Sequence, residues 1–271
     1  MPNIRIGDTQ LHYEDVGRGP AIFLLHAFPL HSGMWQPQVE LLSREHRVIT
    51  MDYRGLGESR PAPEVATMEL LAADAAELLA RLGVVHATVA GLSMGGYVAL
   101  ALYRRSPQLF RGLVLADTKA GPDTAEGRDA RHKFAQDAVV NGMGWVADQM
   151  IPKLLGPNAG PEVVRRVRAL IGENGPAGVA AAQRGMAARP DSEPLLKCVR
   201  CPSLVIVGSE DTLTPPALSE AMAATLQTRV AVIPGAGHLA NLENPKLFAG
   251  EIACFMAGLE TPRRAQRPPP Q

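Results

Sequence analysis

The segment Gly91-Leu92-Ser93-Met94-Gly95 constrains the fold of this chain more than any other feature of its sequence. It lies between the apolar run 86–90, typical of a buried strand, and the apolar run 97–102, typical of a helix. Gly-x-Ser-x-Gly between a strand and a helix is the pattern of a nucleophile elbow, a sharp turn that exposes its serine at the end of a sheet. The glycines permit the close backbone contacts that such a turn requires.

The pentapeptide alone does not establish a nucleophile. The chain contains 26 glycines, so the pattern can also arise by chance. In the alternative interpretation, Ser93 only caps the helix that follows it. The decision depends on whether a base and an acid follow other strands of the same sheet, because a serine hydroxyl is a weak nucleophile without them.

The charge balance excludes several classes of function. The 271 residues include 27 basic and 27 acidic side chains, whereas nucleic acids and anionic membrane surfaces attract proteins with a basic excess. The N-terminal residues lack the apolar region of a signal peptide, and no apolar run has the length of a membrane span. We therefore expect a cytoplasmic enzyme that binds neither nucleic acid nor a membrane.

The three cysteines, Cys198, Cys201 and Cys254, indicate neither a disulfide framework nor a metal site. Their number is odd, and no signal peptide precedes them. Cys198 and Cys201 have the spacing of a redox motif, but they precede an expected strand and not the helix N-terminus that would lower a thiol pKa. A second ligand pair for zinc is missing. We therefore expect reduced thiols, no metal and no cofactor.

Strands alternate with helices along most of the chain. Segments of alternating polarity on either side of Gly7 predict an antiparallel hairpin at a sheet edge, and uninterrupted apolar runs predict strands buried on both faces. The expected strands cover 4–6, 11–16, 21–25, 47–51, 86–90, 112–116, 203–207 and 230–233. Besides the helix after Ser93, the expected helices of this part cover 35–43, 67–82 (with Thr67 as N-cap), 216–225 and 245–258. This alternation predicts an α/β fold with a mostly parallel sheet.

Residues 120–197 interrupt the alternation. They contain no strand-like run, and Gly and Pro separate four expected helices over 125–141, 144–155, 161–173 and 176–188. We interpret this block as a helical cap over the carboxyl ends of the strands, where open α/β sheets bind ligands. Residues 1–119 and 198–260 then form the core. Residues 261–271, which are rich in proline and arginine, are expected to be disordered.

Polar residues follow the expected strands on either side of this block. His238 follows the strand 230–233 and two turn glycines, and it is the best-placed base for Ser93. Asp211 and its neighbour Glu210 follow the preceding strand, and Asp117 follows the strand before the block. Because the carboxyl ends of parallel strands lie at one edge of a sheet, each of the three carboxylates could orient the histidine.

The chain resembles the α/β-hydrolase family from the first hairpin to the last helix. The order Ser93, Asp211, His238 is the family's order of nucleophile, acid and histidine. Residues 208–215 are similar to its acid loop, G-x-x-D-x-x-x-P, which favours Asp211 over the two rival carboxylates, and residues 52–59 are similar to its D-x-R-G-x-G-x-S loop. The resemblance implies an eight-stranded, mostly parallel sheet flanked by helices, with the cap inserted after the sixth strand.

Residues 26–29, His-Ala-Phe-Pro, resemble the family segment, usually His-Gly-x-Pro, that supplies one amide of the oxyanion hole. The second amide belongs to the residue after the nucleophile. The implied donors are the backbone N–H groups of Phe28 and Met94. Ala27 replaces the usual glycine, which requires that its φ be negative. The resemblance implies a structural role for His26.

Within the family, the chain is most similar to small bacterial carboxylesterases, with enol-lactonases and cofactor-free haloperoxidases or perhydrolases close by. Residues 91–97 and 237–245 carry this resemblance. It implies hydrolysis of small to medium acyl esters through an acyl-enzyme. The alternatives are a lactonase for acyl-homoserine lactones or enol-lactones, peracid formation as a side activity suggested by Pro29, and, more remotely, a ligand-binding receptor. The expected partner is a small-molecule ester or lactone, and the expected state is a monomer or a homodimer.

The helical block also contains large side chains that are candidates for the substrate pocket. These are Met143, Trp145, Met150 and Met186. The alternative for each is packing between the helices of the block, for which methionine is equally suited.

Overall fold

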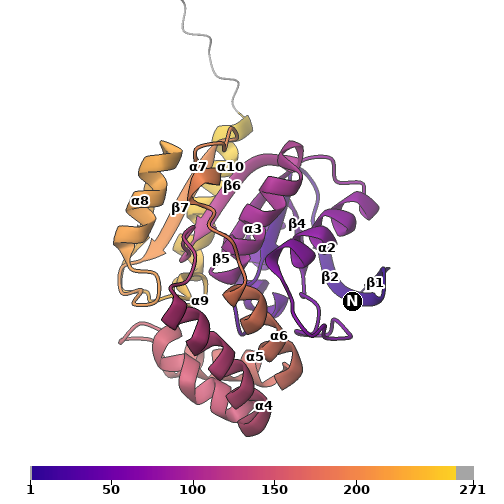
Figure 1. Cartoon of the computed structure of the whole chain (residues 1–271). Coiled ribbons are helices and arrows are strands. Elements are labelled where there is room, and N and C mark those ends of the chain that lie inside the picture. Colours follow the sequence, from indigo (N-terminus) through magenta and orange to yellow (C-terminus); the bar gives the residue numbers. More distant parts are fainter. Residues whose placement is uncertain (1, 261–271) are drawn as a thin grey trace, which may run out of the picture.

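The computed structural model describes residues 2–260, which form an eight-stranded sheet with helices on both faces (Figure 1). The strand order is β1-β2-β4-β3-β5-β6-β7-β8; β1 and β2 pair antiparallel, as do β2 and β4, and the remaining pairs are parallel. The strands are β1 Asn3–Ile6, β2 Thr9–Val16, β3 Ala21–Leu25, β4 Arg47–Met51, β5 Ala87–Leu92, β6 Phe110–Ala116, β7 Ser203–Gly208 and β8 Val230–Ile233. The predicted α/β-hydrolase fold is thus confirmed.

The central strands are buried on both faces. Every residue of β5 is buried, and β3, β4, β6 and β7 have at most one partly exposed or exposed residue each. Parallel strands between two helical layers have this pattern because neither face meets water. The edge hairpin of β1 and β2 instead has exposed and buried positions mixed along both strands. The central position of β5 places Ser93, the next residue, in the middle of the sheet's carboxyl edge.

Two layers of helices cover the sheet. α2 and α3 pack against each other on one face, and α1 and α10 pack against each other on the opposite face (Figure 1). Thr67 caps α2 as predicted, since its side chain accepts a hydrogen bond from the Leu70 N–H. The helices of these layers and the short helices beside them are η1 Ser32–Trp35, α1 Gln36–Leu42, α2 Met68–Arg81, α3 Met94–Arg105, η2 Pro107–Leu109, α8 Pro216–Leu226, α9 Ala240–Glu243 and α10 Pro245–Glu260.

Three helices between β6 and β7, α4 Ala125–Leu154, α5 Pro161–Gly172 and α6 Pro176–Ala187, form a separate helical group at one end of the sheet (Figure 1). The short helix α7 Glu193–Leu196 lies outside this group and contacts α8. The predicted break between the first two helices lies at Gly142, whose φ of 77° divides α4 into two helical segments. The four-residue helices α7 and α9 were not predicted, since one turn is too short for a periodic pattern.

The division of the chain into a core and a cap stays a prediction. Residues 261–271, for which disorder is predicted, lie outside the described residues. No helix within residues 2–260 is both long and apolar enough to cross a membrane.

α6 lies directly against the loop that precedes α2. A Cβ on Gly178 would lie 1.8 Å from the carbonyl oxygen of Gly55, and a Cβ on Gly185 would lie 1.7 Å from that of Ala66. The Ala66 N–H also donates to the Ala181 carbonyl at 3.1 Å. This contact requires glycine on one face of α6, and it fixes the helical group against the sheet domain.

We expect Gly185→Ala to lower the free energy of unfolding by about 1–3 kcal/mol, because α6 must move away from residue 66 to accommodate the methyl group. Gly250→Ala is the matched control. Gly250 is exposed in α10, and a Cβ added there would have no atom within 4 Å, so alanine at this position should stabilise the helix by about 0.5–1 kcal/mol. Urea denaturation of both variants measures the difference; equal stabilities would contradict the close packing of α6.

Candidate active site

Ser93 occupies a strained turn between β5 and α3. Its φ of 56° and ψ of −115° are unusual for a residue with a side chain. Two hydrogen bonds hold this conformation, one from the Ser93 N–H to the Ala116 carbonyl at 2.9 Å and one from the Thr118 hydroxyl to the Ser93 carbonyl at 2.8 Å. β6 and the residues after it therefore fix the backbone of the elbow.

The glycines of the elbow are required by close backbone contacts. A Cβ on Gly91 would lie 2.2 Å from the Gly95 carbonyl oxygen, and a Cβ on Gly95 would lie 2.1 Å from the Leu25 carbonyl oxygen. The first contact lies within the turn, and the second brings the start of α3 against the end of β3. The elbow and the segment after β3 are thus in direct contact.

The structure brings Ser93, His238 and Asp211 together into one hydrogen-bonded chain. His238 Nε2 lies 2.7 Å from Ser93 Oγ, and His238 Nδ1 lies 2.9 Å from Asp211 Oδ2. A carboxylate can only accept, so the imidazole proton belongs on Nδ1 and Nε2 is free to accept the serine proton. His238 and Asp211 are both buried. This is the geometry of a nucleophile, a base and an orienting acid.

Asp211 is held as a carboxylate by its own loop. Its Oδ1 accepts the backbone N–H groups of Leu213 at 2.9 Å and Thr214 at 3.0 Å, and its Oδ2 accepts the Thr214 hydroxyl at 2.5 Å. Burial would raise the pKa of Asp211, but the hydrogen bonds from His238 and Thr214 lower it below its ordinary value. The rival Glu210 is exposed, and its carboxylate accepts from the Ser209 hydroxyl.

Asp117, the other rival, lies at the end of β6 in a different environment. It has a φ of 42° and is fully buried, and its Oδ1 accepts the Gly208 N–H at 2.7 Å. Within residues 2–260, its Oδ2 has no hydrogen-bond partner, and neither oxygen pairs with His238. Burial, with the nearby charge of Asp211 adding to it, raises the pKa of Asp117 well above its ordinary value. Its carboxyl group therefore favours the neutral form.

The segment after β3 is anchored by the His26 ring. His26 Nδ1 donates to the Ala27 carbonyl at 3.0 Å, and Nε2 accepts the Tyr53 N–H at 3.2 Å. Burial lowers the pKa of His26 to about 4, which keeps the imidazole neutral. Both ring nitrogens are therefore engaged in structural bonds. Ala27 is buried and does not have a positive φ, so its methyl group is accommodated in place of the usual glycine.

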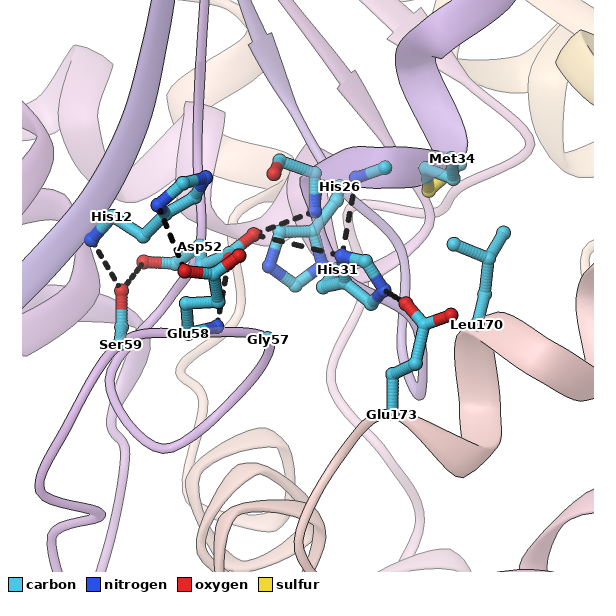
Figure 2. Close-up of polar contacts among 12 residues, drawn as sticks. His12, His26, His31, Met34, Asp52, Gly57, Glu58, Ser59, Leu170 and Glu173 are labelled. Atoms are coloured by element: carbon cyan, nitrogen blue, oxygen red, sulfur yellow. Dashed lines mark hydrogen bonds and ion pairs between the residues drawn. The ribbon is translucent and has the colours of Figure 1, made fainter. Parts of the chain in front are cut away.

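Asp52 organises the loop after β4 (Figure 2). Its Oδ1 accepts the Ser32 N–H and its Oδ2 accepts the Glu58 N–H, both at 2.8 Å. The Ser59 hydroxyl donates to the Asp52 carbonyl at 2.8 Å and accepts the His12 N–H at 2.9 Å. These bonds explain why aspartate and serine stand at the two ends of the D-x-R-G-x-G-x-S segment. They also tie that loop to the segment after β3.

Two residues at the end of α5 contact these loops and were missed by sequence reasoning. Asn174 donates to the Pro29 carbonyl at 2.8 Å, and its side-chain oxygen accepts the Gly57 N–H at 2.6 Å. Glu173 accepts from His31 Nε2 at 2.8 Å, on the side of His31 that faces the helical group (Figure 2). The sequence marks residues 173–176 only as a helix end, and no local pattern indicates partners more than a hundred residues away.

The two predicted oxyanion donors lie on either side of the contact between β3 and α3. Met94 is the first residue of α3, and the first N–H groups of a helix have no intrahelical acceptor. Phe28 lies outside the helices and strands, and its N–H donates to no backbone oxygen within residues 2–260. Both N–H groups are therefore free to bind a ligand. Their role in an oxyanion hole stays a prediction.

A cavity of about 330 Å³ opens above Ser93 and His238. Met150 and Met186 line it, whereas Met143 and Trp145 are not part of its wall. The Trp145 ring instead packs on Phe134, with centroids 5.0 Å apart, and Phe134 lines the cavity. The remaining lining residues are Phe28, Tyr97, Lys119, Asp123, Gly127, Ala130, Arg131, Lys153, Leu154, Gln183, Leu213 and Thr214.

The cysteines take no part in this site. Cys198, Cys201 and Cys254 are free thiols, and burial raises the pKa of Cys201 to about 11, so its thiolate is scarce at neutral pH. Within residues 2–260, no group of three or more His, Cys, Asp or Glu side chains is arranged to hold a metal ion.

A strained serine between a central strand and a helix, paired with a histidine and an acid from the next strand ends, defines a class of hydrolases. The family model of the alpha/beta hydrolase fold matches residues 20–245. The chain therefore belongs to the alpha/beta hydrolase family.

Three relatives show where the chain lies within that family. A thermophilic esterase from Thermogutta terrifontis, solved with malate bound, is 42% identical with a TM-score of 0.94 and covers 96% of this chain and 100% of that one. The enol-lactonase from Burkholderia xenovorans LB400 is 28% identical with a TM-score of 0.87, and the match covers 94% of this chain and 100% of that one. 3-Oxoadipate enol-lactonase 1 of Acinetobacter baylyi is 29% identical, and the match covers 89% of this chain and 90% of that protein.

We expect Asp117→Asn to change how stability depends on pH. When folding raises the pKa of a carboxyl group, the free energy of unfolding of the protein falls as pH rises from the unfolded to the folded pKa value. Asparagine does not titrate, so the variant lacks this loss. The variant should therefore gain free energy of unfolding relative to wild type by up to about 1.4 kcal/mol per pH unit above the unfolded pKa. Denaturation from weakly acidic to neutral pH measures this difference; a pH-independent difference would mean that Asp117 is ionised in the folded protein.

Proposed function

We propose that the protein is a serine hydrolase that cleaves carboxylic esters or lactones through an acyl-enzyme. The observation that carries this proposal is the continuous hydrogen-bonded chain of Ser93, His238 and Asp211 at the floor of a cavity. In this proposal the block 120–197, through its helices α4, α5 and α6, caps the site. The cytoplasmic location and the monomeric or homodimeric state remain predictions.

The reaction follows from the geometry at each atom. His238 Nε2 removes the proton of Ser93 Oγ as that oxygen attacks the carbonyl carbon, and Asp211 stabilises the imidazolium that forms. The N–H groups of Phe28 and Met94 stabilise the oxyanion of the tetrahedral intermediate. His238 then donates its proton to the departing alkoxide, which leaves an acyl ester on Ser93. Water, activated by the same histidine, attacks this ester and releases the acid.

Esters and lactones share this chemistry, because a lactone is an ester whose alcohol remains attached after ring opening. The esterase and enol-lactonase names of the relatives support both substrates for this chain. A cavity of about 330 Å³ is at the lower end of the range for small-molecule sites, which favours small to medium acyl groups. Hydrolysis rates on a panel of p-nitrophenyl esters and lactones would decide between the two.

We expect Ser93→Ala to abolish hydrolysis of p-nitrophenyl butyrate, with a loss of at least about 10⁴-fold in kcat, because no other group in the chain of hydrogen bonds can attack the carbonyl. A fluorophosphonate should label wild type at Ser93 and leave the variant unlabelled. Circular dichroism controls for folding. Near wild-type turnover by the variant would exclude the proposed nucleophile, and labelling without turnover of any ester would favour a ligand-binding role.

The choice of acid has its own test. We expect Asp211→Asn to lower kcat by about 10³–10⁴-fold, because asparagine neither stabilises the imidazolium nor selects the productive tautomer. Glu210→Gln is the matched control, since Glu210 is the adjacent, exposed residue and does not contact His238; its kcat should stay within about twofold of wild type. The reverse order of the two activities would reject Asp211 as the orienting acid.

A further inference from the structure

The cavity above Ser93 has a basic wall. Lys119, Arg131 and Lys153 line it together with Ser93 and His238, and Asp123 is the one acidic residue of the lining. The whole chain has equal numbers of acidic and basic side chains. A local excess of one charge in a concave site attracts ligands of the opposite charge. The cavity therefore has an excess of positive charge, although the chain as a whole has none.

Asp123 does not neutralise this wall, because three cations share its single carboxylate. It accepts from Arg131 at 2.5 Å, from Arg189 at 2.6 and 2.8 Å, and from Lys119 at 3.1 Å. Burial would raise the pKa of Asp123, but the hydrogen bonds from Arg189 and Arg131 lower it below its ordinary value. Three positive charges against one negative charge leave a net charge of +2 in this cluster.

The cluster retains unused hydrogen-bond donors. Arg131 uses Nε for Asp123 and Nη1 for Gln183 and the Met186 sulfur, and its Nη2 has no partner within residues 2–260. Lys153 makes no hydrogen bond or ion pair in the same part of the chain, and its charge adds to the cluster. Arg189, by contrast, is buried behind the cavity wall, where it stacks on the Tyr97 ring at 4.3 Å. Arg131 Nη2 and Lys153 Nζ are therefore free donors on the cavity wall, and Lys119 Nζ uses one of its three N–H groups for Asp123.

The bend in α4 brings Arg131 and Lys153 to the same space. Before Gly142, positions 127, 130, 131 and 134 line the cavity, and after it positions 150, 153 and 154 do. Each set is one face of a helix, since its members are three or four residues apart. Within each set a cationic side chain stands beside apolar ones: Arg131 with Phe134, and Lys153 with Met150 and Leu154. Such a wall suits a ligand with an apolar stem and an anionic end.

We propose that Arg131 and Lys153, supported by Lys119, form a carboxylate subsite, and that the substrate is an ester or lactone bearing a free carboxylate apart from the scissile carbonyl. This inference rests on the proposed function of Ser93 and specifies its substrate class. The carboxylate accepts from Arg131 Nη2 and Lys153 Nζ, and the apolar wall contacts the chain that links it to the reacting ester. Neutral esters of the same length lack these charge-assisted bonds.

The test compares kcat/KM for matched substrate pairs. In one arm, p-nitrophenyl half-esters of glutaric, adipic and pimelic acids are compared with p-nitrophenyl pentanoate, hexanoate and heptanoate, so that the carboxylate is on the acyl side. In the other arm, 4-acetoxybenzoate is compared with its methyl ester, so that the carboxylate is on the alcohol side. Wild type should prefer the anionic member of at least one arm by about 100-fold, because each of the two charge-assisted hydrogen bonds contributes about tenfold. Background hydrolysis is subtracted with Ser93→Ala.

Variants assign the preference to the subsite. Arg131→Gln should reduce the preference about tenfold, because it removes one of the two donors to the carboxylate. Lys153→Glu should reverse the preference, because it removes the other donor and places a negative charge beside the carboxylate. Lys153 is exposed, so its replacement does not disturb folding even if the Arg131 variant is unstable. Lys133→Met is the matched control: Lys133 is an exposed residue of α4 outside the cavity lining, and its loss should leave both members of each pair unaffected.

Each outcome separates the two hypotheses. Turnover of the neutral esters with no anionic preference in either arm, or a preference that survives Lys153→Glu, would overturn the carboxylate subsite and leave the proposed hydrolase intact. Turnover of no ester in either arm and of no lactone in the panel described above would overturn the proposed function itself. Raising the ionic strength should diminish the preference for the anionic member, since Lys153 is exposed to solvent and its interaction is screened; a salt-independent preference would also contradict the subsite.

Discussion

The structure depends on one backbone constraint, the strained, positive-φ conformation of Ser93 between a parallel strand and a helix. Such a conformation costs on the order of 1–3 kcal/mol for a residue with a side chain, so it persists only where the surroundings determine it fully. Here β6 supplies a carbonyl for the Ser93 N–H, Thr118 donates to its carbonyl, and the neighbouring glycines admit backbone contacts that no Cβ would allow. The result is a serine hydroxyl fixed at the centre of the carboxyl edge, where loops from the neighbouring strands can reach it.

The loops around Ser93 are held by the helical group as much as by the sheet. Asn174 at the end of α5 bonds both the segment after β3 and the loop after β4. On the other side of the site, the Glu243 carboxylate accepts the N–H groups of Gly156 and Gly237, which joins the end of α4 to the loop that carries His238. A group of helices that only covered the cavity would need none of these bonds. The helical group therefore supports the loops around Ser93 as well as lining the cavity.

How much the sequence can predict depends on the range of the interaction. The elbow, the acid loop and the histidine loop are local patterns, and a strand that ends before a polar residue places that residue at the carboxyl edge without further information. The partners of Asn174 and Glu243 are not accessible in this way, because both lie in ordinary helix termini. The methionines show the same limit within one helix. Met150 lines the cavity and Met143 does not, although both follow the bend at Gly142 and lie seven residues apart on one face of that segment. Periodicity identifies such a face but cannot show which of its turns lies at the cavity.

Asp117 and Asp211 show why residue type and strand position were insufficient to choose the acid. Both follow adjacent parallel strands, β6 and β7, and both are buried. Asp211 receives bonds from two backbone N–H groups, a hydroxyl and an imidazole, which stabilise its charged form, whereas Asp117 has one donor and one oxygen without a partner within residues 2–260. The charge of Asp211 further disfavours ionisation of Asp117. Burial and the charge of Asp211 thus favour the neutral form of Asp117, whereas its hydrogen-bond donors favour the ionised form of Asp211. An ionised carboxylate stabilises a histidine that must become positively charged.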